Sequence, residues 1–136
     1  MATRPIEDKT WALIKAFTVA AATSVTRGRA VVFAAADNEI SDDVSESQLA
    51  IGIALESGIA GEEVTVALFG VAIVAVIVGT GDATRGVLAV EVATGFTDVT
   101  LVDGTAVRSI PGRFMQSGVA GDEVGLLLQN FVTTAA

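Results

Sequence analysis

Two stretches of the chain repeat one pattern: Gly52–Leu68 reads GIALESGIAGEEVTVAL, and Gly112–Leu128 reads GRFMQSGVAGDEVGLLL. Eight of the seventeen aligned positions are identical, at a constant offset of sixty residues. A shorter match, Thr-Arg-Gly at residues 26–28 and again at 84–86, precedes each copy. A pattern held at fixed spacing over such a length indicates an internal duplication. The sequence therefore predicts two similar units, at about residues 24–78 and 82–132.

Each copy contains Ser-Gly-x-Ala-Gly followed by two acidic residues, which is typical of a tight turn between strands. Glycine adopts positive φ at little cost, and the alternating apolar residues that follow predict a strand with one buried face. Because each unit alone buries too little, we expect the two to pack into a small barrel or sandwich. The residues expected to shape these turns or an interface are Arg27, Gly28, Gly58, Gly61, Glu63, Arg85, Gly86, Gly118, Gly121 and Glu123.

The composition of the 136-residue chain favours the same all-β class, with at most short helices. It contains 20 Val and 14 Gly but only two Pro, and β-branched residues fit a pleated surface. The uncharged run Val64–Val78 is shorter than the roughly 18–20 residues of a spanning helix, and Gly70 interrupts it. Two buried strands explain this run better. Lys15 interrupts the only candidate signal segment, so a secretory leader is not expected.

The polar residues exclude most catalytic chemistry. The chain has no Cys, no His and no Tyr, which removes thiol nucleophiles, imidazole bases and zinc sites of the usual kinds. Its net charge of -8 repels phosphate backbones and anionic lipid. We therefore expect a protein that is not an enzyme, that needs no cofactor or metal, and that binds neither nucleic acid nor a membrane.

Four motifs with possible chemistry have simpler interpretations. The stretch Gly79–Gly86 lacks the third glycine of a dinucleotide-binding loop and the Gly-Lys of a phosphate loop. Adjacent carboxylates Glu62 and Glu63 point to opposite faces of a strand, unlike a glycosidase pair. Arg27 and Arg85 either bind a carboxylate, within the chain or across an interface, or lie on the surface with little energetic effect. The spacing of one acidic cluster does not match a calcium loop, and we expect it in a solvated loop: Asp37, Glu39, Asp42, Asp43 and Glu46.

The first 18 residues lie outside the repeat and contain the only Trp. We expect residues 1–18 to form an extended N-terminal arm and residues 19–136 to form the β domain. Exposed aromatic and apolar side chains on such an arm are typical of a docking element. The alternative is that Trp11 covers the core of its own domain. The docking candidates are Trp11, Leu13, Ile14 and Phe17.

The chain resembles the small capsid decoration, or cement, proteins of tailed bacteriophages. The resemblance covers residues 15 to 131 and rests on turn and strand patterns: KAFT at 15–18, TRG at 26–28, IGIA at 51–54, SGIAGE at 57–62 and VTV at 64–66. It implies a β-rich protein, commonly trimeric, on the outer surface of an icosahedral head. There it would bridge subunits of the major capsid protein and stabilise the shell against the pressure of the packaged DNA.

Two other kinds of function remain open at this point. A head-fibre domain or a receptor- or glycan-binding module would also be a virion protein. Such a module typically needs an exposed cluster of aromatic residues, and this chain has only one Trp and six scattered Phe. An enzyme would have to rely on carboxylates such as Asp42 and Asp43. The first expectation therefore remains a homotrimeric structural protein with the major capsid protein as its partner.

Overall fold

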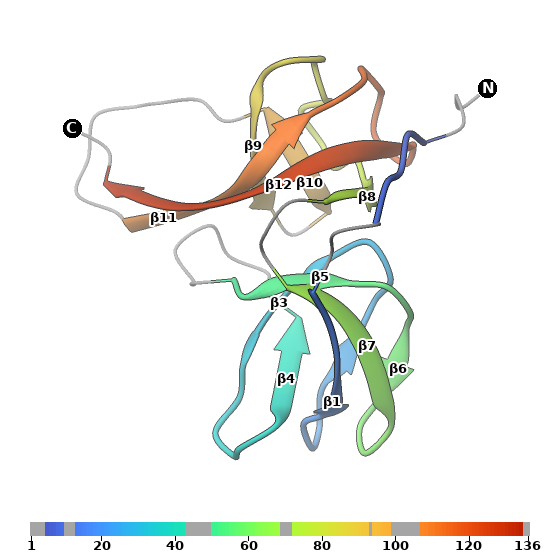
Figure 1. Cartoon of the computed structure of the whole chain (residues 1–136), viewed down its shortest axis with the longest axis vertical. Helices are drawn as coiled ribbons and strands as arrows, with labels where there is room; N and C mark the ends of the chain where they lie inside the picture. The colour runs from blue at the N-terminus through green and yellow to red at the C-terminus, as the bar shows by residue number, and fades with distance from the viewer. Residues whose placement is uncertain are drawn as a thin grey trace.

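The fold is given by a computed structural model that describes residues 5–9, 13–42, 50–68, 72–92, 94–98 and 107–134 (Figure 1). All regular elements among these residues are β-strands, which confirms the predicted all-β class. The strands form two lobes, one above the other along the longest axis of the molecule. The strands of the first lobe are β1 Leu13–Val19, β2 Ser24–Val25, β3 Ala30–Phe33, β4 Glu39–Asp42, β5 Gly52–Ala54, β6 Gly58–Ile59 and β7 Glu63–Leu68.

The first lobe is a closed barrel with the strand order β1-β4-β3-β5-β7, and β2 and β6 pair with each other beside it. In β7 the residues Val64 and Val66 are fully buried, while Glu63 is exposed, as the alternation of a strand requires. Stiff β-branched side chains, mostly valines, make up most of the barrel interior. The barrel core is Phe17, Val19, Val25, Val31, Ile40, Ala54, Val64 and Val66.

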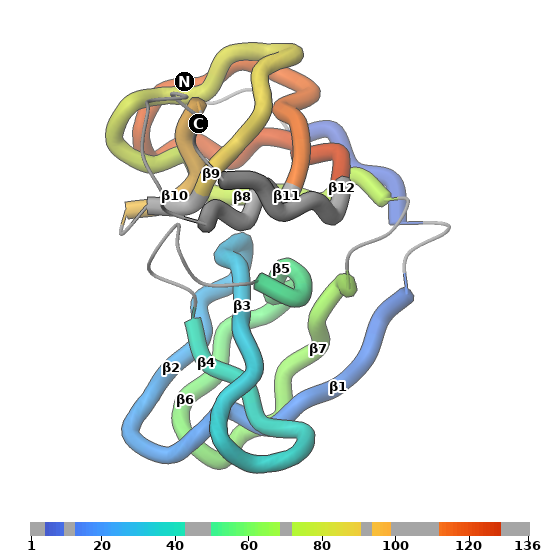
Figure 2. Tube along the Cα trace, turned by 90° about the vertical axis from the view of Figure 1, so that its left-hand side faces the viewer, coloured from blue at the N-terminus to red at the C-terminus, as the bar shows by residue number. Residues whose placement is uncertain are grey.

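The second lobe repeats this arrangement in a five-stranded sheet of order β10-β9-β11-β12-β8 (Figure 2). A parallel bridge between Val78 and Phe96 connects the two ends of this sheet, next to β8 and β10. The register of β11 shifts between Ile110 and Gly112, at Pro111, which has no N–H to donate to a neighbour. The strands of the second lobe are β8 Ile73–Ile77, β9 Leu88–Val92, β10 Gly95–Asp98, β11 Val107–Phe114 and β12 Glu123–Thr134.

The two lobes share the register of their strands as well as their order. In the first lobe β3 pairs with β5 so that Val31 faces Gly52. In the second lobe β9 pairs with β11 so that Ala89 faces Gly112, at the matching positions. The other matched pairings are β5–β7 with β11–β12, β3–β4 with β9–β10, β1–β7 with β8–β12, β2–β6 with the bridge Ala83–Gly118, and β1–β4 with the bridge Val78–Phe96.

Two of the expected boundaries differ in the structure. Residues 13–18, expected in an extended arm, belong to β1, which pairs antiparallel with β7 from Leu13 to Thr18. The reason is that this pairing buries Phe17 and Val19 inside the barrel. The strand β8 was expected at the end of the first unit, but it pairs with β12 and belongs to the second lobe. Each lobe therefore begins one strand earlier than the repeated turns indicated.

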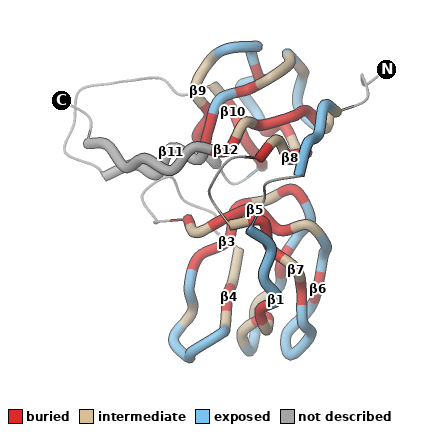
Figure 3. The backbone as a smooth tube through the Cα atoms, in the orientation of Figure 1, coloured by how far each residue is buried: buried red, intermediate tan, exposed pale blue. Residues whose placement is uncertain are grey.

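A common core joins the lobes. The larger cluster of buried residues contains the interior of the second lobe, including Phe96 and Phe114, and also Ala30, Ile53 and Ala67 of the first lobe. Figure 3 shows buried segments on both sides of the plane where the lobes meet. The short Ala side chains allow the strands of the first lobe to approach the second closely. The two lobes therefore pack as one unit.

Candidate functional site

The repeated turns bring the Thr-Arg-Gly and Ser-Gly pieces of each copy together. The backbone N–H of Arg27 donates to Oγ of Ser57 at 2.9 Å. In the second lobe the N–H of Arg85 donates to Oγ of Ser117, also at 2.9 Å. The two arginines thus have equivalent partners, and their side chains extend from equivalent turns.

The glycines of these turns have structural roles. Gly61 and Gly121 have φ values of +87° and +92°, which favour glycine over other residues. Gly58 and Gly118 lie so close to a valine of the next strand that a Cβ would come within 2.5 Å of Cγ1 of Val64 and 2.8 Å of Cγ1 of Val124. We find no ligand-facing role for these four glycines.

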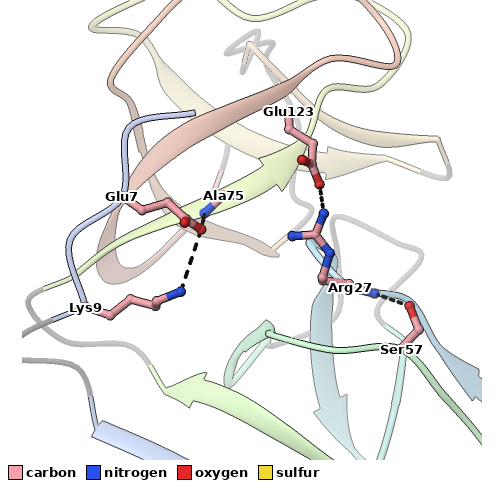
Figure 4. Close-up of polar contacts among 6 residues, drawn as sticks. All are labelled: Glu7, Lys9, Arg27, Ser57, Ala75 and Glu123. Carbon is pink, nitrogen blue, oxygen red and sulfur yellow. Dashed lines mark hydrogen bonds and ion pairs between the residues drawn. The ribbon is translucent and has the colours of Figure 1, made fainter. Parts of the chain in front are cut away.

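Arg27 forms an ion pair between the lobes. Its guanidinium donates to Oε1 of Glu123 at the start of β12, and both side chains are partly exposed (Figure 4). Beside it, the carbonyl of Gly28 accepts a hydrogen bond of 3.3 Å from the N–H of Ile77. Gly28 has a φ of +83°, and a Cβ there would lie 3.2 Å from Cγ1 of Ile77. Of the two alternatives for Arg27, the structure thus shows the carboxylate contact, within the chain.

The equivalent residues of the second lobe face solvent. Arg85 and Gly86 are exposed, and nothing lies within 4 Å of a Cβ built at Gly86. Arg85 makes no ion pair with any residue in the described part of the chain. It lines a shallow groove together with Arg113, whose guanidinium donates to the carbonyl of Gly86 at 2.5 Å. Glu63, the counterpart of Glu123, is also exposed at the start of β7.

The candidate docking residues separate into two groups. Leu13 and Ile14 in β1 are 65% and 46% exposed. Phe17, expected to dock on a partner, is only 4% exposed, which corrects that expectation: it lies opposite Val64 in the barrel and packs inward. Trp11 lies outside the described residues. Only Leu13 and Ile14 of the described candidates are therefore available to a partner.

A short N-terminal segment lies along the edge of β8. Asp8 exchanges two backbone hydrogen bonds of 2.8 Å with Ile73, and the carboxylate of Glu7 accepts from the N–H of Ala75 at 3.2 Å (Figure 4). Lys9 lies 3.8 Å from the same carboxylate. These contacts fix Glu7 and Asp8 to the second lobe, although β1, the strand that follows them in the chain, belongs to the first.

The described members of the acidic cluster, Asp37, Glu39 and Asp42, form no metal-binding arrangement. Within the described residues no three carboxylates come together in a way that could hold an ion, and Asp43 and Glu46 lie outside those residues. Oδ1 of Asp42 accepts from the N–H of Thr26 at 3.1 Å, and Oδ1 of Asp98 accepts from the N–H of Thr84 at 2.8 Å. Burial raises the pKa of Asp42, while the hydrogen bond from Thr26 and the charge of Arg29 oppose this rise. These carboxylates hold the Thr-Arg-Gly turns in place.

Four exposed apolar residues were not among the expected site residues: Ile6, Phe33, Ile59 and Val119. Ile59 and Val119 occupy the variable position of the two Ser-Gly-x-Ala-Gly turns, where a hydrophobic residue in both copies was a signal available in the sequence. Phe33 lies edge-on to Phe17, with the ring centroids 6.2 Å apart. Its position at the end of β3 gave no such signal.

The fold defines the class of molecule: an all-β protein with two lobes of one topology. No helix in the described part of the chain is long and apolar enough to cross a membrane. No family model and no curated protein matches the sequence. Among solved structures, the chain is similar to the crystal structure of the N base of the head fiber gp8.5 of bacteriophage phi29, with a TM-score of 0.64 and 20% identity over 86% of this chain and 95% of that one.

Proposed function

We propose that this chain is a structural protein of a bacteriophage virion that binds the outer surface of the head and connects neighbouring subunits of the major capsid protein. The observation that carries the proposal is the likeness of fold to the base of a phage head fiber, which extends over nearly the whole of both chains. The fold alone does not specify a function, so the remaining support for the proposal comes from the residues on the surface.

The exposed end of β1 offers a suitable docking surface. Leu13 and Ile14 are large apolar side chains at the exposed start of a strand whose last three residues, Phe17 to Val19, are anchored in the barrel (Figure 3). At Leu13 to Ala16 the described strand β1 is paired with β7 only, because its pairing with β4 involves Thr18 and Val19. An apolar strand with one unpaired edge can extend a partner's sheet or insert into an apolar groove.

The remaining chemistry agrees with a role in binding rather than catalysis. The sequence lacks His, Cys and Tyr, and the described residues contain no group of three or more carboxylates arranged to hold a metal ion. In this proposal several copies, as a homotrimer, bind at once, so that weak contacts at each site add up to firm attachment. The net charge of -8 keeps densely displayed copies from adhering to nucleic acid or to anionic membranes.

Substitution is a sharper test than truncation, because Glu7 and Asp8 bond to β8 and β1 begins at Leu13. The variant Leu13→Ser/Ile14→Ser keeps the backbone and removes the apolar surface. We expect it to fold, as judged by circular dichroism, and to lose most of its occupancy on expanded heads in a co-sedimentation assay. The matched control is Val119→Ser, which removes an exposed apolar side chain from a turn of the second lobe. Full occupancy of the double variant would contradict the proposed docking surface.

The base of a head fibre is the second candidate, and the same likeness of fold favours it. Such a base also attaches to the head, but its purpose is to present a receptor-binding part rather than to strengthen the shell. The two roles differ in one measurement, the resistance of heads to heat or to chelators with and without the bound protein. A stabilised shell supports the decoration role, whereas unchanged shells together with binding to host cells or a glycan array support the fibre role.

A further inference from the structure

The contact between the two lobes joins unlike surfaces. The first lobe contributes Arg27 and Gly28, and the second contributes Glu123 and Ile77. Because the lobes share one fold, each also carries the surface that the other uses. We call the side of the junction with Arg27 and Gly28 the Arg27 surface, and the side with Glu123 and Ile77 the Glu123 surface. The second lobe therefore has a copy of the Arg27 surface, and the first lobe has a copy of the Glu123 surface. A contact between unlike surfaces always leaves one of each kind free at the ends.

The copy of the Arg27 surface lies open on the second lobe. Gly28 is buried against Ile77, but its counterpart Gly86 is exposed, and a Cβ added there would meet nothing within 4 Å. A second pair of equivalent positions differs in the same way: Ile53 is fully buried at the junction, while its counterpart Arg113 is exposed. A surface that is covered in one lobe is thus uncovered in the other.

The copy of the Glu123 surface lies open on the first lobe. Ala75 of β8 is 7% exposed, but Ala16, its counterpart in β1, is exposed. Glu63 occupies the position of Glu123 and makes no ion pair within the described residues. The first lobe therefore presents the carboxylate of Glu63 near the exposed Ala16 of β1.

The two open surfaces have complementary charges. Arg85 and Arg113 line one groove on the second lobe, in a chain whose net charge is -8. Glu63 stands at the matching position of the first lobe. Arg27 and Glu123 show that this fold can pair an arginine of one turn with a glutamate of the other lobe. Charge complementarity of this kind directs association and fixes the register of the partners.

We propose that copies of this chain associate head to tail, with Arg85 of one copy paired with Glu63 of the next. The contact between copies has an ion pair equivalent to that of the internal junction. It has no equivalent of the backbone hydrogen bond from Ile77 to Gly28, because the corresponding groups, in Thr18 and Gly86, already have partners. The carbonyl of Gly86 already accepts from Arg113, and the N–H of Thr18 already donates to the carbonyl of Asn38 at 2.8 Å. The exposed surface of the second lobe is also more polar than the buried junction, because it has Arg113 at the position where the junction has Ile53. The contact between copies is therefore weaker than the junction and reversible, as suits chains that fold separately.

This inference rests on the self-association proposed above, and it names the surfaces that meet. Sedimentation velocity over a range of concentrations tests it without any capsid. We expect the wild type to self-associate, and Arg85→Glu and Glu63→Arg each to lower the association constant by about tenfold or more, since each places like charges together. The double variant Arg85→Glu/Glu63→Arg restores the opposite charges and should return to within about threefold of the wild type.

The matched control is the internal pair. Arg27→Glu lowers the stability of the monomer but leaves the surface of Arg85 intact, so its association should not change. A wild type that remains monomeric at all concentrations overturns both self-association and this contact. A wild type that associates, with single variants that associate equally well, overturns this contact alone and leaves self-association standing. Head binding, measured separately through Leu13 and Ile14, reports on the virion role.

Discussion

Ser57 and Ser117 accept the same hydrogen bond in the two halves of the molecule. The hydroxyl oxygen of each lies 2.9 Å from the backbone nitrogen of an arginine, Arg27 in one lobe and Arg85 in the other. Each bond ties the Thr-Arg-Gly turn to the Ser-Gly turn about thirty residues further along the chain. The duplication therefore extends from the sequence to individual polar contacts.

Ser57→Ala and Ser117→Ala should each lower the free energy of unfolding by about 1 kcal/mol, the usual net effect of losing one hydrogen bond. Because both donors lie at exposed turns, water partly replaces the lost hydroxyl, so larger losses are not expected. The two effects should agree within about 0.5 kcal/mol and should add in the double variant, since the sites share no partners. Urea denaturation measures all three values. A loss confined to one of the two variants would show that the two turns differ in energy.

The class of fold and the turns could be predicted because both depend on local patterns. Gly61 and Gly121 recur with positive φ, and in β7, the strand after Gly61, Val64 and Val66 are buried while Glu63 is exposed. Such patterns act over a few neighbouring residues and leave a direct trace in the sequence. The pairing of Arg27 with a carboxylate was one of two alternatives, because residue type and turn position do not determine which partner lies nearby.

The first strand of each lobe could not be assigned in this way. β1 begins outside the repeated motif, and β8 lies within a long apolar run that also contains β7, so no change of pattern marks a boundary. Which lobe each of these strands belongs to is determined by its pairing: β1 pairs with β7, and β8 pairs with β12, in each case about fifty residues away in the chain. The burial of Phe17 follows from the same pairing. Contacts between distant residues of this kind are not encoded in any short stretch.

The ion pair between Arg27 and Glu123 should contribute little to stability on its own. Both side chains are partly exposed, and exposed pairs are typically worth about 0–1 kcal/mol. In a double-mutant cycle with Arg27→Ala and Glu123→Gln, we expect a coupling energy of about 0.5 kcal/mol that falls as salt is added. Chemical denaturation at low and high ionic strength measures it. A coupling energy unaffected by salt would mean that the two side chains interact through packing instead.

Gly28 and Gly86 occupy equivalent positions, so a comparison of alanine variants at the two positions measures the energetic contribution of packing at the junction between the lobes. Both have positive φ, +83° and +86°, so alanine is strained at both positions, at a cost on the order of 1 kcal/mol or more. Only Gly28 also meets Ile77, at 3.2 Å from a built Cβ. Thermal or urea unfolding of Gly28→Ala should therefore show a larger loss than that of Gly86→Ala, by about 1 kcal/mol. Equal losses would mean that the lobes can separate slightly at no cost.

The pKa of Asp42 gives the stability a specific dependence on pH. Burial raises this pKa in the folded state, so the charged carboxylate is disfavoured there relative to the unfolded chain. The resulting penalty is absent below the unfolded pKa of about 4 and grows as the pH rises through the folded pKa. Asp42→Asn removes the charge but keeps an oxygen for the N–H of Thr26. At pH 7 the free energy of unfolding of the variant should equal or exceed that of the wild type. As the pH falls towards 4, the stability of the wild type relative to the variant should increase.

Asp42→Ala separates the effect of the charge at this position from that of the hydrogen bond. It removes the acceptor of Thr26 N–H as well as the charge, so it should be less stable than Asp42→Asn by about 1 kcal/mol at every pH. Urea denaturation between pH 4 and pH 7.5 measures both differences. If the wild type instead lost stability relative to Asp42→Asn as the pH fell, the carboxylate would be stabilised in the folded state, and Arg29 and the Thr26 N–H would outweigh burial. The sign of this slope therefore decides which of the opposing effects at Asp42 is larger.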